Sequence, residues 1–480
     1  MILAPVVQYA LCYGTKKSAM PAPNEATRIV EAVADRSAHG LAAAVNRLIR
    51  SGELPPGTRL PTVRVLAREL GVSPTTVGEA WRLLARVGAI ETRGRNGSYV
   101  NGSTPPSEPA RFWRLAGVAG HFARDLSAGI PDPALLPQLG PALARVDGQP
   151  PLSGYLDNPV VPALEALVRQ AWADGGVGEP EALTIVDGSL DGIDRLLTSL
   201  VHFGDRVVVE NPTFPPFLDL LEVLGATPVP VAADDQGVLP AALTSALAEG
   251  TAAAVVLQPR AQNPTGASMT RRRARQLAQV VQRAPGVTVV EDDHSGAVAA
   301  ADPISLAAHV PNQTVLVQSF SKSHGPDLRL AALGGPAAIV EPLVARRHLG
   351  ASWSSRFLQQ VLVGMLTDPT CTAAVDRARV IYAERRAALR QALAERGVTS
   401  SGRDGINVWV DVDHERDALI VLAAQGIGVA PGSAFVVGPS GGDHIRVTTS
   451  TLPVDEADTV ADAIAHAAHP RPRPHARSHR

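Results

Sequence analysis

Lysine, cysteine and aromatic residues are scarce in this chain of 480 residues. Only three of its 44 basic residues are lysines, two of its residues are cysteines, and 4% are aromatic. The two cysteines, Cys12 and Cys371, are too few for a disulfide scaffold or a four-cysteine zinc site, which favours a reducing, cytoplasmic location. No uninterrupted apolar stretch is long enough to span a membrane, so we expect a water-soluble protein.

The composition is that of a large globular protein with unevenly distributed charge. Hydrophobic residues make up 45% and charged residues 19% of the chain, which excludes a disordered or collagen-like protein. Residues 26–100 hold 11 arginines against six acidic residues, whereas 101–480 hold 31 basic against 39 acidic residues. A basic front part on an acidic body predicts two folding units with separate tasks.

The segment 101–110, NGSTPPSEPA, has the proline, glycine and serine content of a linker. We therefore expect a disordered tail at 1–25, a small basic unit at 26–100, a linker at 101–124, a large unit at 125–469 whose main subdomain covers about 165–345, and a disordered basic tail at 470–480.

The small unit opens with three helical patterns. Apolar residues recur at helical spacing in 41–49, 63–70 and 77–84. Gly71 suits the left-handed position that ends the second helix, and Ser73 suits the N-cap of the third. Because so short a turn joins these two helices, the sequence predicts a helix-turn-helix.

Two short strand-like runs, 89–92 and 98–100, follow the third helix and flank an Asn-Gly pair, which predicts a hairpin or wing. Such a unit binds DNA with its third helix in the major groove. The candidate DNA contacts are Ser73, Thr75 and Thr76 in the first turn of that helix, and Arg64, Arg93 and Arg95 for backbone phosphates. A three-helix module for protein interaction is the alternative.

The segment from Leu48 to Val100 resembles the winged helix-turn-helix of GntR-type transcription regulators over nearly its whole length. The resemblance implies double-stranded operator DNA as a partner. Pro74 and Gly78 stand where that family often has arginine in the recognition helix, so the base contacts are expected to differ.

The large unit alternates short apolar runs with helical patterns. The runs are 183–186, 206–210, 253–258, 287–292, 315–319 and 330–333, and the helical patterns include 192–200, 217–224 and 271–282. This alternation predicts an α/β fold with a mostly parallel sheet that helices cover on both faces. Ligands of such sheets bind beyond the carboxyl ends of the strands.

Residues with polar or aromatic chemistry gather at those ends. They are Gly188, Ser189 and Leu190 after the first run, Phe214 after the second, Asn263 after the third, Asp292 and His294 at the fourth, and Ser319 and Lys322 at the fifth, with Arg329 seven residues beyond the lysine. Each has an ordinary structural explanation when taken alone: the glycine turn caps a helix, NPTG is a turn, and Phe214 belongs to the core.

Lys322 is the only lysine after position 17. A guanidinium cannot form a Schiff base, so the retention of one amine in a chain that otherwise uses arginine fits covalent chemistry. Chance survival of a single lysine is the alternative. Together the residues describe pyridoxal 5′-phosphate (PLP): Ser189, Ser319 and Arg329 for the phosphate, Phe214 stacked on the ring, Asp292 for the ring nitrogen, Asn263 for the ring hydroxyl and Lys322 for the aldehyde.

From Asp125 to about His469 the chain resembles a fold-type I aminotransferase, most specifically in LSAGIPDPALLP, NPTG and SFSKSHGPDLRL. The resemblance implies that Lys322 is the Schiff-base lysine and Asp292 the partner of the ring nitrogen. It also implies that Arg446 pairs with a substrate α-carboxylate and that Tyr155 reaches the cofactor phosphate of the partner subunit, which makes the protein a homodimer.

Three positions depart from the aminotransferase pattern. His294 stands where relatives usually have tyrosine beside the ring hydroxyl, so we expect a site that responds to pH. Val160-Val161 and Glu165 replace a usual glycine and arginine. These changes argue against efficient transamination more than against cofactor binding.

The combination of the two units resembles the MocR subfamily of transcription regulators. It implies a cytoplasmic regulator that senses PLP, an amino compound or both through the aminotransferase-like body. Two alternatives stay open: a working aminotransferase with an accessory DNA-binding domain, and a DNA-binding protein whose body binds no cofactor.

Overall fold

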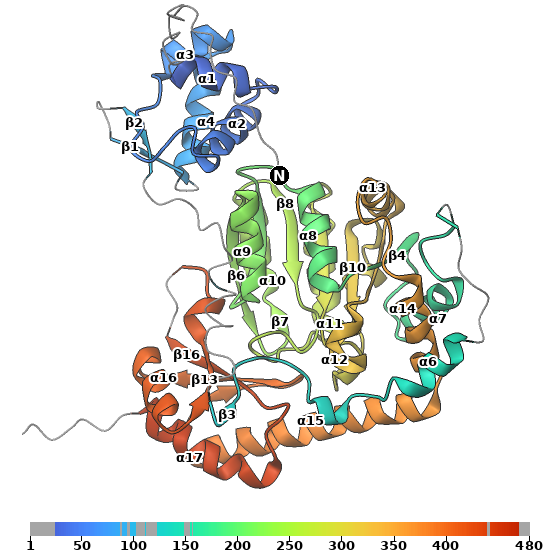
Figure 1. Cartoon of the computed structure of the whole chain (residues 1–480). Helices are drawn as coiled ribbons and strands as arrows, with labels where there is room; N and C mark the ends of the chain where they lie inside the picture. The colour runs from blue at the N-terminus through green and yellow to red at the C-terminus, as the bar shows by residue number, and fades with distance from the viewer. Residues whose placement is uncertain are drawn as a thin grey trace, which may run out of the picture. The chain divides into compact units, whose positions relative to one another are not determined.

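The computed structural model describes residues 25–86, 89–93, 97–101, 111, 122–147, 154–155, 157–438 and 442–469. The chain divides into two compact units, Met1–Thr104 and Pro105–Arg480 (Figure 1). The expected tails except Glu25, most of the expected linker and Arg95 lie outside the described residues. Within the described part, no helix is long and apolar enough to cross a membrane.

The small unit is a helical bundle with a hairpin. Its elements are α1 (Glu25–Ala32), α2 (Ala38–Arg50), α3 (Val63–Leu70), α4 (Pro74–Arg86), β1 (Ile90–Thr92) and β2 (Ser98–Val100). The three predicted helices and the hairpin are present, whereas α1 was not predicted because it starts where the sequence suggests a tail. Leu41, Leu66 and Leu84 are fully buried and tie α2, α3 and α4 into one core.

The turn between α3 and α4 has the geometry that its residues predict. Gly71 adopts the left-handed conformation at φ 67° and ends α3. The Thr76 backbone N–H donates to Ser73 Oγ over 3.1 Å, so Ser73 caps the start of α4. The two helices form the predicted helix-turn-helix.

The large unit is built on an eight-stranded sheet. Its strands are β4 (Ala182–Val186), β5 (Arg206–Asn211), β6 (Thr227–Asp234), β7 (Gly237–Val238), β8 (Ala252–Leu257), β9 (Thr288–Asp293), β10 (Thr314–Ser319) and β11 (Ala331–Gly335). They lie in the order β4-β11-β10-β9-β8-β5-β6-β7. The five strands from β10 to β6 are mutually parallel, whereas β11 runs antiparallel to both neighbours. The predicted mostly parallel sheet is therefore confirmed.

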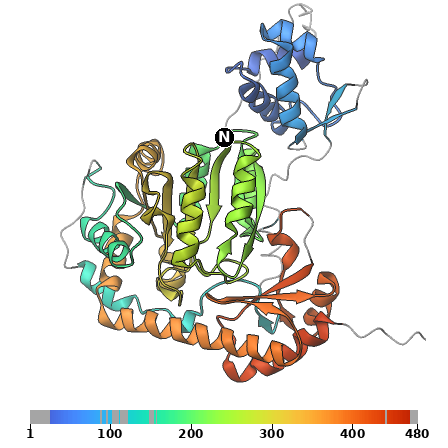
Figure 2. The same cartoon turned by 180° about the vertical axis from the view of Figure 1, so that it is seen from behind.

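Helices cover both faces of this sheet, as the two opposite views show (Figures 1 and 2). On one face pack α8 (Ser189–Leu200), α9 (Pro215–Leu224) and α13 (Ala337–Arg347), against side chains such as Val207 and Val209. On the other face α10 (Pro240–Ala248) and α11 (Arg271–Val281) pack against Val208. The continuous valine run of β5 is thus buried on both sides.

A second subdomain follows the long helix α15 (Pro369–Glu395). It contains the antiparallel sheet β12 (Ser400–Ser401), β13 (Asn407–Val412), β16 (Asp443–Thr448) and β15 (Ala430–Pro431), with helices α16 (Glu415–Ala424) and α17 (Ala457–Ala468). Strand β3 (Arg124–Asp125) pairs with β14 (Ile427–Gly428), so the first strand of the large unit belongs to its C-terminal subdomain.

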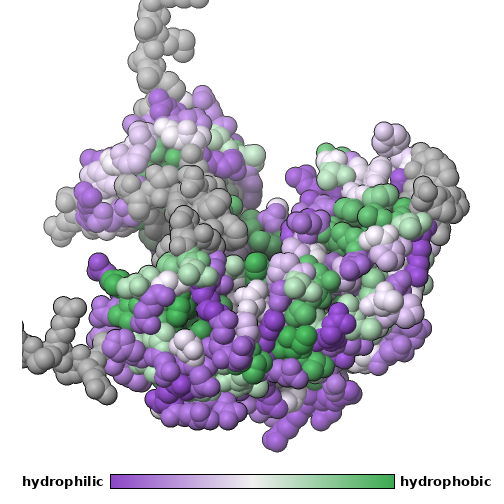
Figure 3. Space-filling view, turned by 60° about the horizontal axis from the view of Figure 1, so that its bottom comes forward, coloured by the Kyte–Doolittle hydropathy of each residue, from purple (hydrophilic) through white to green (hydrophobic). Residues whose placement is uncertain are grey.

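The remaining helices of the large unit are α6 (Gly140–Asp147), α7 (Pro162–Asp174), α14 (Arg356–Leu366) and the short α12 (Ser321–His324). Apolar surface appears in separate patches among polar side chains (Figure 3). Tyr155 is 86% exposed and Phe357, on α14, is 54% exposed.

Candidate functional site

The predicted site residues of the large unit lie where the strands of the parallel sheet end. Gly188 precedes α8 with φ 100°, a conformation that L side chains rarely adopt. A Cβ at Gly188 would lie 2.7 Å from an Arg329 guanidinium nitrogen. Arg329 also donates to the Asp187 carbonyl over 3.0 Å, so the structure brings Arg329 against the start of α8. The α8 N-terminus and this arginine form a cradle for an anion.

Lys322 lies on α12, shortly after β10, and its amine interacts electrostatically with both Asp292 and Arg446. Burial, reinforced by the positive charge of Arg446, lowers the pKa of Lys322 to about 8. A lysine with this pKa is partly unprotonated near neutral pH, which is the form that attacks an aldehyde.

Asp292 lies at the end of β9 and is 1% exposed. Burial raises the pKa of Asp292 to about 7, and the hydrogen bond from Gln258 opposes that rise. Its Oδ2 accepts from Gln258 Nε2 over 2.8 Å, while its Oδ1 is buried without a hydrogen-bond partner among the described residues. A buried carboxylate oxygen that has no partner among the described residues is suited to accept a hydrogen bond from a ligand.

Asn263 follows β8 and meets an arginine of the second subdomain. Arg446 Nη1 donates to Asn263 Oδ1 over 3.3 Å, and Arg446 Nη2 donates to the Ser127 carbonyl. Because the amide oxygen of Asn263 is engaged, its NH₂ group remains to donate to a ligand. Burial lowers the pKa of Arg446 to about 10, so this arginine stays charged at neutral pH.

The His294 side chain is hydrogen-bonded to the main chain. Its Nε2 lies 2.9 Å from the Ala261 carbonyl, which fixes Nε2 as the protonated nitrogen. Burial, together with the nearby Lys322 charge, lowers the pKa of His294 to about 4. The ring therefore stays neutral above pH 5, and the expected pH response near neutrality does not come from His294.

The other predicted cofactor residues are spread around the same edge. Phe214 is the N-cap of α9 and packs edge-on against Phe217 at 5.4 Å. Ser319 ends β10 and its Oγ accepts from the Ser321 backbone N–H over 3.2 Å. Leu190, in the first turn of α8, lines an open cavity of about 420 Å³ that also reaches Arg329. Tyr155 lies apart from these residues in contact with Trp353, at 6.1 Å between ring centroids.

Several residues of the site were not predicted. Gln258 joins Asp292 to the Asn263 loop, and Glu210 accepts from the Gln258 backbone N–H over 3.0 Å. Arg260 forms a buried two-bond ion pair with Asp293, with distances of 2.7 and 3.0 Å. Their only sequence signal was position, since Gln258 ends a predicted strand and Arg260 lies between that strand and NPTG.

These residues fit PLP. The unpartnered Asp292 Oδ1 suits a protonated ring nitrogen, the cradle of Gly188 and Arg329 suits a phosphate, and Lys322 supplies the amine. Within the described ranges, no group of three or more His, Cys, Asp or Glu side chains that could hold a metal ion occurs.

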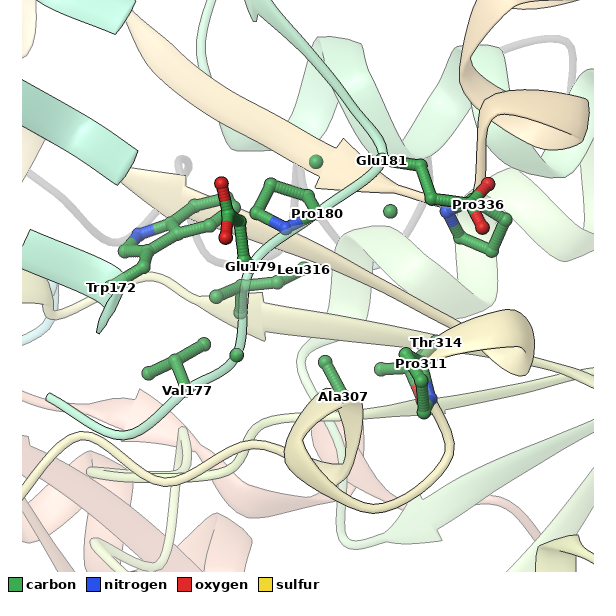
Figure 4. A pocket seen from close by; sticks show the side chains of 13 residues that line it. Trp172, Val177, Glu179, Pro180, Glu181, Ala307, Pro311, Thr314, Leu316 and Pro336 are labelled. Carbon is green, nitrogen blue, oxygen red and sulfur yellow. The ribbon is translucent and has the colours of Figure 1, made fainter. Parts of the chain in front are cut away.

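A second hollow lies at the opposite edge of the sheet, where β4 and β10 begin. Trp172, Glu179, Glu181 and Pro336 are among the residues that line it (Figure 4). Its volume of about 30 Å³ is the share of a single water molecule in the liquid, so it is too small for a cofactor.

In the small unit the candidate DNA contacts are at the surface. Arg64, Ser73, Thr75 and Arg93 are exposed and Thr76 is half-buried. Ser73 Oγ and Thr76 Oγ1 lie 2.9 Å apart, so these two hydroxyls are hydrogen-bonded to each other. Arg93 forms an ion pair with Glu91 at 3.1 Å and lies over the Tyr99 ring. The positive charge of Arg64 is therefore less compensated by neighbouring carboxylates than that of Arg93.

Comparison with known proteins identifies both units. The family of class I and II aminotransferases matches residues 124–464, and the gntR family of bacterial regulatory proteins matches residues 38–100. The vitamin B6 salvage pathway transcriptional repressor PtsJ of Salmonella typhimurium is 36% identical, over 90% of this chain and 98% of its own length. The pyridoxine biosynthesis transcriptional regulator PdxR of Corynebacterium glutamicum is 25% identical, over 83% of this chain and 88% of its own length.

Solved structures show the same fold in the large unit. The α-aminoadipate aminotransferase LysN of Thermus thermophilus, complexed with N-(5′-phosphopyridoxyl)-L-leucine, matches 74% of this chain and 94% of its own with a TM-score of 0.66 and 22% identity. An archaeal alanine:glyoxylate aminotransferase matches 80% of this chain and 97% of its own with a TM-score of 0.67 and 21% identity. The chain therefore belongs to the class I and II aminotransferase family and, through its winged helix, to the GntR regulators of the MocR type, which are DNA-binding transcription regulators.

Proposed function

We propose that this regulator binds PLP at the carboxyl edge of its large sheet and changes its affinity for operator DNA when PLP, or an amino compound that reacts with it, is bound. The observation that carries the proposal is the pair formed by Lys322, a buried amine of lowered pKa, and Asp292, whose buried Oδ1 has no partner among the described residues. The names of the relatives PtsJ and PdxR, both tied to vitamin B6, support it.

When bound, PLP supplies an electrophilic aldehyde and an electron-withdrawing ring. The chain's own residues would then hold it in place. Gly188, Ser189, Ser319 and Arg329 would hold the phosphate, Leu190 and Phe214 would contact the ring, and Asn263 would donate to the ring hydroxyl. His294 would hold the loop beside the ring through its hydrogen bond to the Ala261 carbonyl.

The small unit would hold operator DNA through α4 and the wing. The Ser73, Thr75 and Thr76 group and the exposed Arg64 and Arg93, with Arg95 beyond the described residues, supply polar and positive contacts to bases and phosphates. We place the domain limits as the sequence suggested, with DNA binding in 26–100 and PLP binding in 125–469.

A homodimer is part of the proposal. Tyr155 is 86% exposed next to Trp353, and Phe357 is 54% exposed on α14. Large aromatic side chains in this position are typical of a surface that a second protein covers. A second copy of the chain would bury them and bring Tyr155 to the partner's phosphate.

Turnover as an aminotransferase is the second candidate. Arg446 is buried beside Asn263 and stays charged, which suits an α-carboxylate. Glu165 replaces an arginine of related proteins, so this position carries no positive charge. Glu165 instead forms an ion pair with Arg169 at 2.9 Å on α7.

One set of measurements separates the candidates. The purified full chain is mixed with PLP, and its absorbance and its binding to the DNA upstream of its own gene are followed, with Lys322→Ala as the control variant. We expect a PLP absorbance band that Lys322→Ala abolishes, and a change in DNA affinity of about 5- to 150-fold on PLP binding. Repeated turnover of amino acids with 2-oxoglutarate, without a sequence-specific shift, contradicts the regulator.

A further inference from the structure

A buried glutamine, Gln258, directly follows β8 and is 3% exposed. Its Nε2 donates to Asp292 Oδ2 over 2.8 Å, and its Oε1 accepts from the Asn263 backbone N–H over 2.8 Å. One side chain thus bridges the carboxylate assigned to the ring nitrogen and the loop that carries the amide assigned to the ring hydroxyl.

The direction of this amide is fixed by its partners. A backbone N–H can only donate, so Asn263 requires the oxygen of Gln258, and this turns the NH₂ group toward the carboxylate. The opposite orientation would set two donors against each other and an amide oxygen against a carboxylate. The Gln258 backbone N–H also donates to Glu210 Oε2 over 3.0 Å, which holds the main chain in place.

The bridge leaves one atom of each residue for a ligand. Asp292 Oδ2 is engaged by Gln258, so Oδ1 is the oxygen without a partner in the described structure. The Asn263 loop is held by Gln258 and its Oδ1 accepts from Arg446, so its NH₂ group remains. Neither side chain can turn without breaking a buried hydrogen bond, which costs about 1–3 kcal/mol.

We propose that Gln258 is a positioning residue that holds Asp292 and Asn263 at the spacing of the ring nitrogen and the ring hydroxyl of PLP. This inference rests on the proposed function. It assigns Gln258 a role through two other residues, since Gln258 has no free polar atom of its side chain directed at the ligand.

The charges around Asp292 make the donor of Gln258 important. Asp293 on β9 disfavours a charged Asp292, whereas Lys322 on α12 favours it. Glu210 of β5 also interacts with Asp292 and repels it only when Glu210 is itself ionised. Beyond Lys322 lies Arg446 of β16, and His294 is neutral. Gln258 donates to the Asp292 carboxylate over 2.8 Å, and the Ser189 side chain is a second, weaker donor that also lowers the pKa of Asp292.

The test compares two variants in the full chain, Gln258→Met and Gln258→Glu. The PLP dissociation constant is measured at about pH 6 and about pH 8, each time relative to the natural protein at the same pH. Gln258→Met removes donor and acceptor, so we expect PLP to bind about tenfold more weakly at both pH values.

Gln258→Glu gives a different signature. A protonated carboxyl has one donor and one acceptor and reproduces both bonds, whereas the ionised form has no donor and repels Asp292. We expect nearly natural affinity at about pH 6 and a loss of about tenfold or more at about pH 8. A residue with only a packing role would not produce this recovery at low pH.

The matched control is Gln318→Met. The Gln318 side chain donates to the neighbouring Asp293 over 3.3 Å and accepts from Trp172, so its hydrogen bonds go to residues other than Asp292 and Asn263. We expect PLP affinity within about twofold of that of the natural protein. A twofold change corresponds to less than about 0.5 kcal/mol, which is no larger than the scatter expected for a site that does not act on the ligand. Thermal melting shows that each variant is folded.

The outcomes separate this inference from the proposed function. If the natural protein does not take up PLP, or if Lys322→Ala leaves its absorbance unchanged, the proposed function fails. If the natural protein binds PLP through Lys322 while Gln258→Met binds it within twofold, the inference alone is overturned. An equal loss for Gln258→Glu at both pH values also overturns it, because shape and not hydrogen bonding would then matter.

Discussion

Arg446 Nη1 donates to Asn263 Oδ1 over 3.3 Å, which ties strand β16 of the second subdomain to the loop after β8 of the large sheet. The guanidinium also lies over the Phe435 ring at 5.1 Å, and its Nε has no hydrogen-bond partner within the described residues. An arginine held in this way is already oriented, so a ligand carboxylate can bind it without the entropy loss of ordering the side chain.

Arg446→Gln should therefore weaken the response to amino acids. Charge-assisted hydrogen bonds are worth about 1.5–3 kcal/mol, so we expect the concentration of amino acid needed to change the PLP spectrum to rise about 10- to 100-fold. A simple alkylamine without a carboxylate serves as the matched ligand, and its titration should be nearly the same in both proteins. Equal losses for amine and amino acid would place the carboxylate elsewhere.

Gly188→Ala should damage the phosphate cradle. The backbone at Gly188 has φ 100°, and the new Cβ would lie 2.7 Å from Arg329, so both backbone strain and a displaced guanidinium are expected. We expect a loss of about 1–3 kcal/mol in the free energy of unfolding and weaker PLP binding. Denaturant unfolding and PLP titration measure the two effects.

Gly286→Ala is the matched control for this change. A Cβ at Gly286 meets no atom within 4 Å, and Gly286 is not among the glycines of positive φ. We expect unchanged PLP affinity and stability within about 0.5 kcal/mol. If Gly188→Ala behaves like Gly286→Ala, the contact with Arg329 does not matter.

Glu91→Gln should strengthen DNA binding. Arg93 and Glu91 are both more than half exposed, and their ion pair at 3.1 Å reduces the positive charge of the wing. Removal of the carboxylate leaves Arg93 to a phosphate, so the slope of log affinity against log salt should become steeper by about 0.9 for the one added contact. The double variant with Arg93→Gln should lose this gain, and mobility-shift titrations over a salt series would show an unchanged slope if the wing does not touch DNA.

Glu210 should make the PLP-free protein less stable as the pH rises. Burial raises the pKa of Glu210 to about 8, far above its ordinary value, so the folded state holds a proton that the unfolded state has lost. Stability then falls with rising pH up to about pH 8, by as much as about 1.4 kcal/mol per pH unit for one proton. Below pH 6.5 the buried His294, whose pKa is lowered to about 4, acts in the opposite direction.

Asp292 and Glu291, whose pKa values burial raises to about 7, add to this decline below about pH 7, and Lys322, whose pKa is lowered to about 8, opposes it near pH 8. The contribution of Glu210 is therefore the difference between the natural protein and a Glu210 variant between about pH 6.5 and pH 8. Glu210→Gln, which keeps an acceptor for the Gln258 backbone N–H, should flatten the decline in the free energy of unfolding over that window. Urea unfolding at closely spaced pH values measures it. An unchanged slope would mean that Glu210 is ionised in the folded state.

The sequence predicted the sheet through its apolar runs but not the direction of every strand. The run at 330–333 has the same character as its neighbours, yet β11 is antiparallel, because only the residues between Ser319 and Ala331 connect it to β10. A parallel connection would need a crossover of a dozen or more residues. β6 was not predicted because Pro228 and Pro230 argue against a strand. The sheet accepts them because its outer neighbour is the two-residue β7.

The site shows the same limit. Lys322 was predicted because lysine is so rare in the chain, and Asn263 because NPTG is distinctive. Gln258 has no such signal, since a glutamine after a strand is common and its importance arises only from the partners that folding gives it. Buried pairs such as Arg260 and Asp293, 33 residues apart, depend likewise on the register of neighbouring strands.

The reversal of β11 has a consequence for how a ligand is held. Because β11 starts at the edge where β10 ends, Lys322 and Arg329 belong to a single short connection between two hydrogen-bonded strands. If PLP binds as proposed, this one connection would hold both its aldehyde end and its phosphate end. A displacement of the second subdomain relative to the sheet would then leave the distance between these two contacts unchanged.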